Sequence, residues 1–545
     1  MSYSFNLLDR PWIPCITGPG TIEALSIRET LTRAHDLRAI SHHSPLVPVS
    51  VLRVLLAILH RVHGPKDAAE WTALWEKGKF EPGPLDDYFS RWYERFELLD
   101  GERPFYQDPC LGENFAIPVS KLMHEAASGN NATLFDHSLD DFSKTVPVGE
   151  AALQLVAHQV FALGGLGTPD PAIEGSKSAN GAPTVKAALC IVHGGSLFET
   201  LLLNLRRYDL PGGYPFGASN DVPAWERGQA AEVCDRIPTG WVDLLTWQSR
   251  RIRLFPEGES ATPTIRRVAV LKGESVDNSV SLAGKDSMFA WQKLLTPAKN
   301  AEPWIPLGFR EDRALWRDTH SLFARFSDVS RRPPILEWIS ELREEGFSPS
   351  RVLALQAAGI CSDQAKVMSW HTESLPLSLT IVAEPRLCAQ IRLALDCCEA
   401  GEFAIKVAVR QLAERLLVPA DRVGGEKKSA DKGAVSLLAS SLHRTHHYWG
   451  RLRLHFQHFI SDLEKQANAI DPDTGEAPSL AEWRQSCRHS ASEAMRLTWL
   501  ATGEGERTFR AVAEAEAVFQ REMNKRIPNH RAKKENADYV TTSAG

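Results

Sequence analysis

The feature that most constrains the fold of this chain is a change of pattern near residue 376. Beyond it, apolar residues recur at helical spacing over four long stretches, at about 384–418, 434–468, 479–502 and 506–526. Short polar breaks separate these stretches, at 424–428, 471–475 and 503–505. Four amphipathic helices with short polar connections predict a four-helix bundle over residues 376–527, followed by a flexible polar tail at 528–545.

The first 375 residues carry a different pattern, in which short strands and short helices are broken by many Pro and Gly residues. Two Ser-x-x-Glu sequences match the capping box and predict helix starts, at Ser26–Glu29 here and at Ser479–Glu482 in the bundle. The predicted fold class is therefore α+β: a large mixed N-terminal domain over residues 1–375, followed by a C-terminal four-helix bundle.

The composition disfavours some classes of protein but does not identify a function. The 545 residues are 43% hydrophobic and 24% charged, with a net charge of −6, so the overall charge does not itself favour nucleic-acid binding. The nine cysteines form no CxxC pair, which predicts reduced thiols. Because we find neither a signal peptide nor an uncharged apolar stretch of about 18 residues, we expect a cytoplasmic protein without a membrane span.

The chain opens on an apolar segment that ends in Arg10-Pro11-Trp12-Ile13-Pro14. Pro11 and Pro14 fix φ, and the large side chain of Trp12 between them needs a deep apolar pocket. We therefore expect a first strand that is followed by a buried aromatic plug.

Two hairpins are predicted from paired apolar runs. One joins residues 247–255 to 265–271, and the other joins 351–360 to 365–370 around Cys361-Ser362-Asp363-Gln364. A glutamine at a projecting tip can lie against base edges, and a hairpin is stiff enough to act as a wedge. From the residues alone, a solvated turn is the alternative interpretation.

Two long loops interrupt the mixed domain. Residues 125–147 contain Leu134-Phe135-Asp136-His137, an aromatic in a polar setting, and residues 164–183 are rich in Gly and Pro. Loops of this length inside a compact domain are usually functional or disordered.

Paired arginines occur at Arg250-Arg251 and at several other places. Neighbouring side chains on a strand point to opposite faces, so we interpret each pair as part solvated surface and part ion pair. Several such pairs together could still follow a phosphate backbone.

The best metal candidate is a histidine-rich segment, with His443 and His447 expected at i and i+4 on one helix and His455 and His458 beyond them. A zincin needs Glu after the first His, and Arg444 stands there instead. We find no phosphate-binding loop, no nucleophile elbow and no assembled catalytic set, so we predict no enzymatic activity.

Several segments, taken in order, resemble those of one known family. They are Asn6-Leu7-Leu8 with Trp12-Ile13-Pro14, then Arg103-Pro104-Phe105-Tyr106-Gln107, Ser128 to His137, Leu197 to Asn204, Trp247-Gln248 and the final bundle. This order is similar to the CasA family, the large subunit of the type I-E CRISPR Cascade complex. One departure is Ser249, which stands where the family has a proline after Trp-Gln.

The resemblance implies a non-catalytic DNA-recognition subunit in antiviral defence. Such a subunit reads the protospacer-adjacent motif (PAM) of double-stranded target DNA from the minor groove, promotes strand opening and R-loop formation, and recruits the helicase–nuclease. Its implied partners are the guide RNA, the target DNA, the helicase–nuclease and the backbone, guide-end and small subunits of Cascade. No cofactor or membrane is implied. Some relatives carry a four-cysteine zinc knuckle, but residues 235–360 hold no cysteine, so we predict no zinc.

The resemblance also assigns site residues. The glutamine wedge falls on Gln364, in Ser362-Asp363-Gln364. The glycine loop falls on Gly175, Ser176, Lys177 and Ser178, and the lysine finger on Lys293, with Lys299 as the rival. The tip of the loop that docks into the complex falls on Phe135, Asp136 and His137.

This assignment is physically reasonable. The minor groove offers a degenerate code, so few contacts there give a short, tolerant readout. Two alternatives remain open: a metal-dependent enzyme built on the His-rich segment, and an assembly scaffold with no DNA contact.

Overall fold

A computed structural model of the chain describes residues 3–125, 144–207, 220–297, 302–325, 329–349, 353–363, 366–418 and 430–528. The chain divides into two compact units, Met1–Leu379 (unit 1) and Thr380–Gly545 (unit 2). Unit 1 mixes short strands and helices, and unit 2 is helical, so the predicted α+β class is confirmed.

The strands of unit 1 are short, apart from two hairpins. They are β1 Ile13–Thr17, β2 Ile22–Leu25, β3 Leu37–Ile40, β4 Ile117–Pro118, β5 Val146–Pro147, β6 Gly165–Leu166, β7 Ser178–Ala179, β8 Leu189–His193, β9 Asp235–Arg236, β10 Arg250–Glu257, β11 Thr264–Lys272, β12 Ser275–Val276, β13 Trp291–Lys293, β14 Trp304–Pro306, β15 Ser330–Arg331, β16 Leu353–Asp363 and β17 Lys366–Leu377.

The helices of unit 1 are α1 Ile27–Thr32, α2 Leu46–His63, α3 Ala68–Lys77, α4 Pro82–Trp92, α5 Val148–Phe161, α6 Leu197–Leu203, α7 Trp241–Leu245, α8 Thr319–Phe323 and α9 Pro334–Glu344, and α10 Leu379–Ala383 follows. The capping box predicted at Ser26 is confirmed, because the Ser26 hydroxyl accepts from the Glu29 N–H while the Glu29 carboxylate accepts from the Ser26 N–H.

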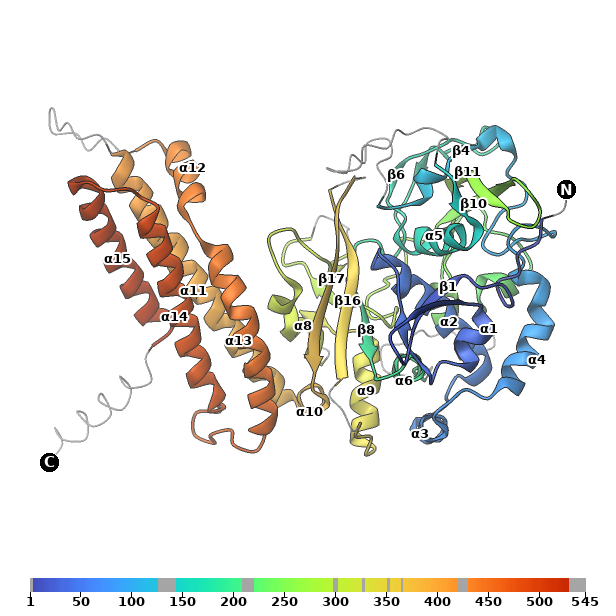
Figure 1. Ribbon diagram of the computed structural model, residues 1–545. Helices are drawn as coiled ribbons and strands as arrows, with labels where there is room; N and C mark the ends of the chain where they lie inside the picture. The colour runs from blue at the N-terminus through green and yellow to red at the C-terminus, as the bar shows by residue number, and fades with distance from the viewer. Residues whose placement is uncertain are drawn as a thin grey trace. The chain divides into compact units, whose positions relative to one another are not determined.

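The strands form several small sheets rather than one large one. Their orders are β2-β1-β3, β10-β11-β4 with β5 also on β11, β12-β9, β14-β13-β15, β17-β16-β8 and β6-β7. Figure 1 shows β8 beside the upright hairpin β16–β17. Both predicted hairpins are confirmed, as β10–β11 and as β16–β17.

Helix α2 runs through the core of unit 1. It is long enough and apolar enough (mean hydropathy 1.6) to cross a membrane, yet 72% of it is buried inside the protein, as expected of a core helix. Arg53 in its middle is 2% exposed, and its guanidinium binds the Asp286 carboxylate at 2.9 Å and the Leu244 carbonyl at 2.7 Å. These partners compensate the buried charge and tie α2 to distant parts of unit 1.

The N-terminal segment differs in part from the prediction. Trp12 is a buried plug, 3% exposed, and its indole N–H donates to the Leu7 carbonyl at 3.1 Å. The strand predicted before it is wrong, because the Asn6 side-chain carbonyl accepts from the Leu8 N–H and the Asn6 backbone carbonyl from the Arg10 N–H. These local bonds form a turn, and the first strand begins only at Ile13.

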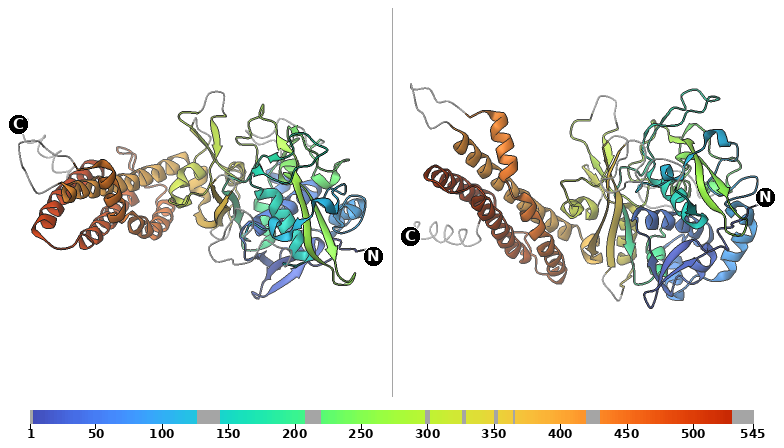
Figure 2. Two further views of the ribbon diagram at one scale, coloured as in Figure 1. Left: turned by 90° about the horizontal axis from the view of Figure 1, so that it is seen from above. Right: turned by 45° about the horizontal axis from the view of Figure 1, so that its top comes forward.

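Unit 2 is built from α11 Pro385–Leu417, α12 Lys432–Leu442, α13 Thr445–Lys465, α14 Ser479–Leu500 and α15 Glu506–Arg526. Figure 2 shows these helices running alongside one another. The single helix predicted over 434–468 is wrong, since it is broken between α12 and α13. The capping box predicted at Ser479 is also wrong: Ser479 is the first helical residue, and Pro478 precedes it as the N-cap without a side-chain bond.

Two aromatic side chains fasten α13 and α14 to α11. The Tyr448 hydroxyl donates to the Cys398 carbonyl at 2.8 Å, and the Trp483 indole N–H donates to the Ala394 carbonyl at 2.8 Å. Gly401 makes room for the phenol, which a Cβ at that position would strike. The bundle core therefore depends on polar contacts as well as on apolar packing.

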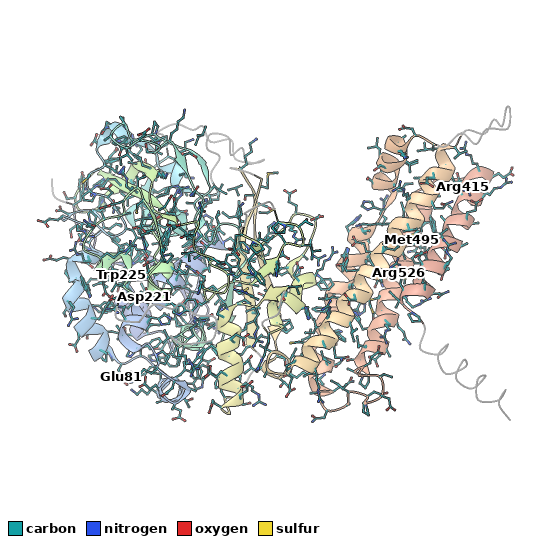
Figure 3. All side chains as sticks on the ribbon, turned by 180° about the vertical axis from the view of Figure 1, so that it is seen from behind. Glu81, Asp221, Trp225, Arg415, Met495 and Arg526 are labelled. Carbon is teal, nitrogen blue, oxygen red and sulfur yellow. The ribbon has the colours of Figure 1, made fainter. Side chains whose placement is uncertain are left out.

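Arginines hold the α11–α15 edge of the bundle from outside. Arg415 binds Glu514 at 2.6 Å, and the Arg526 guanidinium lies 3.8 Å from the centroid of the Phe403 ring. Figure 3 labels Arg415 on α11, Arg526 on α15 and the buried Met495 on α14. The predicted tail, from residue 529 on, lies outside the described residues.

Candidate nucleic-acid interface

The hairpin β16–β17 projects beyond its sheet. Strand β8 pairs with β16 only from Ala354 to Ala358, whereas β16 and β17 stay paired as far as Asp363 opposite Lys366. Gly359 begins the projecting part, and a Cβ there would lie 2.6 Å from the Ala187 carbonyl oxygen. Only glycine permits this close approach where the hairpin leaves the sheet.

One face of the hairpin is braced against the residues that precede α8. Glu373 is 8% exposed, and its carboxylate accepts from the Leu315 N–H at 2.8 Å and the Trp316 N–H at 2.9 Å, at the start of a short helical turn. The His371 ring stacks on Phe309, with centroids 5.4 Å apart. Both contacts hold the hairpin at the root of its projecting part, where Glu373 lies opposite Ala357 and His371 opposite Gly359.

Two of the three predicted wedge residues, Ser362 and Asp363, lie at the described end of this hairpin. Ser362 is partly exposed and follows a bulge between Cys361 and Ser362, and Asp363 is the last residue of β16. Gln364 lies outside the described residues. Contact of these residues with DNA stays a prediction.

The predicted glycine loop, residues 175–178, leads into β7 of the small ribbon β6–β7, which two arginines anchor. Arg250 and Arg251 begin β10 and are 7% and 8% exposed. The Arg250 guanidinium donates to the Asn180 carbonyl at 2.9 Å and to the Leu163 carbonyl, which flank the ribbon. Arg251 binds the Asp170 carboxylate inside the loop at 2.6 Å.

The interpretation of this arginine pair as partly solvated surface is therefore wrong. Both side chains of Arg250 and Arg251 turn inward because carbonyls and a carboxylate of the loop satisfy them. Burial lowers the pKa of Arg250 to about 10, which leaves it charged at neutral pH.

The four predicted glycine-loop residues have different surroundings. Gly175 has φ +76°, a conformation that favours glycine. Ser176 is buried, and its hydroxyl donates to the Asp170 carbonyl at 3.0 Å and accepts from the Asp170 N–H at 2.8 Å. Lys177 and Ser178 are exposed. Ser176 thus shapes the loop, and the exposed pair is better placed to meet a ligand.

The predicted lysine finger, Lys293, is the exposed last residue of β13. Its Nζ lies 5.9 Å from the centroid of the Trp304 ring, and the Arg331 guanidinium lies 4.3 Å from the same centroid. Two cations therefore share one indole. The rival, Lys299, lies outside the described residues, as does the predicted docking tip Phe135, Asp136 and His137.

The histidine-rich segment does not have the predicted geometry. His443 is the C-cap of α12 with φ −65° and ψ 144°, and α13 begins only at Thr445. The Arg444 guanidinium donates to the Ser441, Leu442 and His443 carbonyls and so stabilises this break. His443 and His447 are therefore not i and i+4 on one helix.

Among the residues that the structure describes, no group of three or more His, Cys, Asp and Glu side chains is arranged to hold a metal ion. His446 and His447 pack ring to ring, with centroids 4.3 Å apart, and His455 and His458 are exposed on α13. The observation that favoured a metal-dependent enzyme is thereby lost.

The structure places the described candidate residues at three separate sheets of unit 1: on β17-β16-β8, in β7 and the turn before it beside β6-β7, and on β14-β13-β15. The residues that position them were missed from the sequence. Glu373, Arg250 and Arg251 all act over long sequence separations, and no local signal identifies them.

The fold is that of an α+β protein with a C-terminal helical bundle, which carries a braced hairpin and an arginine-anchored ribbon. The model of the family "CRISPR-associated protein Cse1" matches residues 6–494. The chain belongs to this family, so the predicted family is confirmed.

Individual proteins of known sequence and structure are also similar to this chain. The chain is 33% identical over 531 residues, 95% of its length and 97% of the relative's, to CRISPR-associated protein CasA/Cse1 of Thermus thermophilus. The crystal structure of CasA from Thermus thermophilus is similar with a TM-score of 0.77 at 29% identity, covering 96% of this chain and 99% of that one. A chain of a "CRISPR RNA-guided surveillance complex" shares the fold, with a TM-score of 0.73 at 21% identity over 95% of this chain and 100% of that one.

Proposed function

We propose that this chain is the large subunit of a type I-E Cascade surveillance complex in antiviral defence. In that role it recognises the PAM of double-stranded DNA through the minor groove, promotes strand opening and recruits the helicase–nuclease in the cytoplasm. Membership of the Cse1 family supports this proposal, as does the shared fold with a chain of an RNA-guided surveillance complex.

The braced hairpin β16–β17 carries the proposal. Separating the first base pairs costs a few kcal/mol of unstacking, and a wedge contributes only if it does not bend away. Glu373 and Gly359 hold the hairpin against the body of unit 1, and its free end extends past β8. Gln364, the next residue in the sequence after Asp363, is the residue we assign as the wedge.

The ribbon and the lysine complete the proposed readout. Lys177 and Ser178 are exposed on a loop that buried arginines fix, and Lys293 is exposed at the end of β13. Few contacts suffice, because pairing between guide RNA and DNA reads the sequence once opening has begun. A net charge of −6 is compatible with this role, since the other Cascade subunits would hold the guide.

The test compares Gln364→Ala with Gln485→Ala, an exposed glutamine of α14, in the reconstituted complex. Permanganate reactivity of unpaired thymines reports opening of a PAM-bearing duplex. We expect opening to slow about tenfold or more in Gln364→Ala, as loss of a few kcal/mol of wedge contact allows, and to stay normal in the control. Unchanged opening would refute the wedge, and binding that ignores the PAM would favour a scaffold.

Docking into the complex is a separate part of the proposal and concerns Phe135, Asp136 and His137. An aromatic at a loop tip can fill a pocket on a neighbouring subunit. We expect Phe135→Ala to lower the fraction of the chain that co-purifies with the other subunits. Normal incorporation would contradict the docking assignment.

A further inference from the structure

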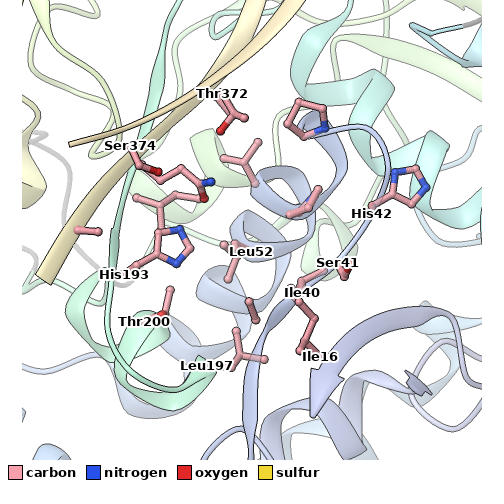
Figure 4. A pocket seen from close by; sticks show the side chains of 18 of the residues that line it. Ile16, Ile40, Ser41, His42, Leu52, His193, Leu197, Thr200, Thr372 and Ser374 are labelled. Atoms are coloured by element: carbon pink, nitrogen blue, oxygen red, sulfur yellow. The ribbon is translucent and has the colours of Figure 1, made fainter. Parts of the chain in front are cut away.

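Unit 1 contains a cavity of about 640 Å³ at the root of the projecting hairpin. One wall is the face of sheet β17-β16-β8, and the others come from the end of β3, the start of α2 and the start of α6. Figure 4 shows His193 and Ser374 on the sheet side and Leu52 and Ile40 across the cavity from them. The volume falls within the range of roughly 300–1,000 Å³ that is common for ligand pockets.

The register of the hairpin explains why its side chains line this cavity. Cross-strand partners share one face of a sheet, and Gln356 pairs with Ser374, Ala358 with Thr372 and Ile360 with Trp370. Of these, Trp370 is 37% exposed and presents an indole at the rim. The face opposite to the Glu373 brace is thus open and lined by side chains.

The chemistry of the cavity favours an uncharged ligand. Within the described part of the chain, no Asp, Glu, Lys or Arg lines it. The His42 Nε2 atom lies 3.3 Å from the Glu150 carboxylate and pairs with it. The wall facing the sheet is apolar and includes Pro45, Pro48 and Leu52. A phosphate would find no cation here, whereas a flat, neutral ring would find apolar walls.

A polar edge complements these walls. On β8, the buried Nε2 atom of His193 makes no well-aligned hydrogen bond within the described residues, and the Gln356 side chain is a polar partner of the imidazole. Thr372 and Ser374 add hydroxyl groups from β17. Buried polar atoms are nearly always satisfied, so this edge is suited to the donors and acceptors of a ligand.

We propose that this cavity holds one unpaired nucleobase of the displaced DNA strand, stacked on Trp370. The inference rests on the proposed function, because only a subunit that opens DNA would meet such a base. Trp370 pairs with Ile360, and β16 ends three residues later at Asp363. The distance from Ile360 to Asp363 along the strand is about 10 Å. That length equals about three nucleotide steps of duplex, so a base freed near the tip can reach the rim.

The test measures binding of the guide-loaded complex to a target duplex with a preformed bubble, so that opening by the wedge is not required. A guide of short complementarity keeps the affinity measurable. Abasic nucleotides replace successive positions of the displaced strand near the PAM. For the wild-type chain we expect one or two positions to lose affinity roughly five- to hundredfold, the range for one base stacked on an aromatic side chain.

Trp370→Ala should abolish this position-specific loss, because the stacking partner is gone. Met368→Ala is the matched control: Met368 is 53% exposed on the same strand and does not line the cavity, so the loss should persist. Ala358→Leu, which fills the cavity from its floor, should behave like Trp370→Ala. If abasic substitutions affect wild type and Trp370→Ala equally at every position, the cavity holds no base. A failure of the wedge proposal would be distinguishable, because Gln364→Ala would then open a fully paired duplex normally while the abasic signal in the bubble stayed intact.

Discussion

The brace at Glu373 makes a quantitative prediction about the hairpin. Its carboxylate accepts two backbone N–H groups, from Leu315 at 2.8 Å and Trp316 at 2.9 Å, and the residue is 8% exposed. Glu373→Ala removes both acceptors and leaves two amides at the start of a helical turn without partners. Glu373→Gln keeps one acceptor and turns an NH₂ donor toward the second amide.

The magnitude follows from these bonds. A hydrogen bond to a charged group contributes about 1.5–3 kcal/mol, so losing both costs about 3 kcal/mol or more in Glu373→Ala. Glu373→Gln should cost about 2 kcal/mol, since one bond weakens to a neutral one and the other becomes a donor–donor contact. The control is Glu345→Gln, which replaces an exposed carboxylate at the C-terminal end of α9.

Hydrogen exchange measures the loss where it should occur. We expect the β17 amides from residue 366 to 374 to exchange about 30-fold faster in Glu373→Gln, as a loss of about 2 kcal/mol allows, while the amides of α2 keep their protection. Duplex opening should slow in the same variant, because a loosened hairpin bends away. If β17 protection is unchanged in both Glu373 variants, the hairpin is held by other contacts and the reasoning fails.

Three further predictions concern the rest of the chain. Trp12→Ala should destabilise unit 1 by about 3–5 kcal/mol, measured by urea unfolding, because it leaves a cavity and removes the bond to the Leu7 carbonyl. Burial lowers the pKa of His124 to about 4, so as the pH falls this imidazole is protonated in the unfolded chain before it is protonated in the folded chain. The free energy of unfolding of unit 1 should therefore be unaffected by His124 above about pH 6.5 and fall by about 3 kcal/mol as the pH drops to about 4. In His124→Phe the free energy of unfolding should depend less on pH over this range. Finally, the purified chain should carry no stoichiometric zinc by mass spectrometry. The double variant His443→Ala/His447→Ala should lose only about 1 kcal/mol of stability, because it removes one hydrogen bond, between the half-buried His443 ring and the Thr445 hydroxyl, while His447 is exposed.

Much of the fold could be predicted because its signals are local. The periodicity of α11, α14 and α15 and the alternation of β10–β11 arise from neighbouring residues, and their predicted positions agree with the structure. The break between α12 and α13 could not be predicted from periodicity. It depends on Arg444, whose guanidinium binds three carbonyls at the end of α12 and competes with continued helix.

In the candidate site, too, the features with local signals could be predicted and those that depend on distant contacts could not. The hairpin β16–β17 could be predicted from its paired apolar runs, but its brace joins residues 58 positions apart in the chain. The ribbon was foreseen only as a glycine-rich loop, and its anchors lie 70 to 87 positions away. Contacts of this kind depend on the tertiary arrangement. No local sequence pattern around a glutamate or an arginine identifies its distant partner.

The burial of two arginines bears on the DNA recognition that we propose for this chain. From the sequence, Arg250 and Arg251 are candidates to neutralise phosphates, yet both are engaged by the ribbon they support. Their burial leaves three exposed lysines among the described residues at the proposed readout, Lys177, Lys293 and Lys366, and three phosphate contacts give only modest affinity. If unit 1 reads DNA as proposed, recognition depends on rigid presentation more than on charge. The contacts that provide this rigidity, at Arg250 and Glu373, are buried beneath the proposed DNA-binding surface.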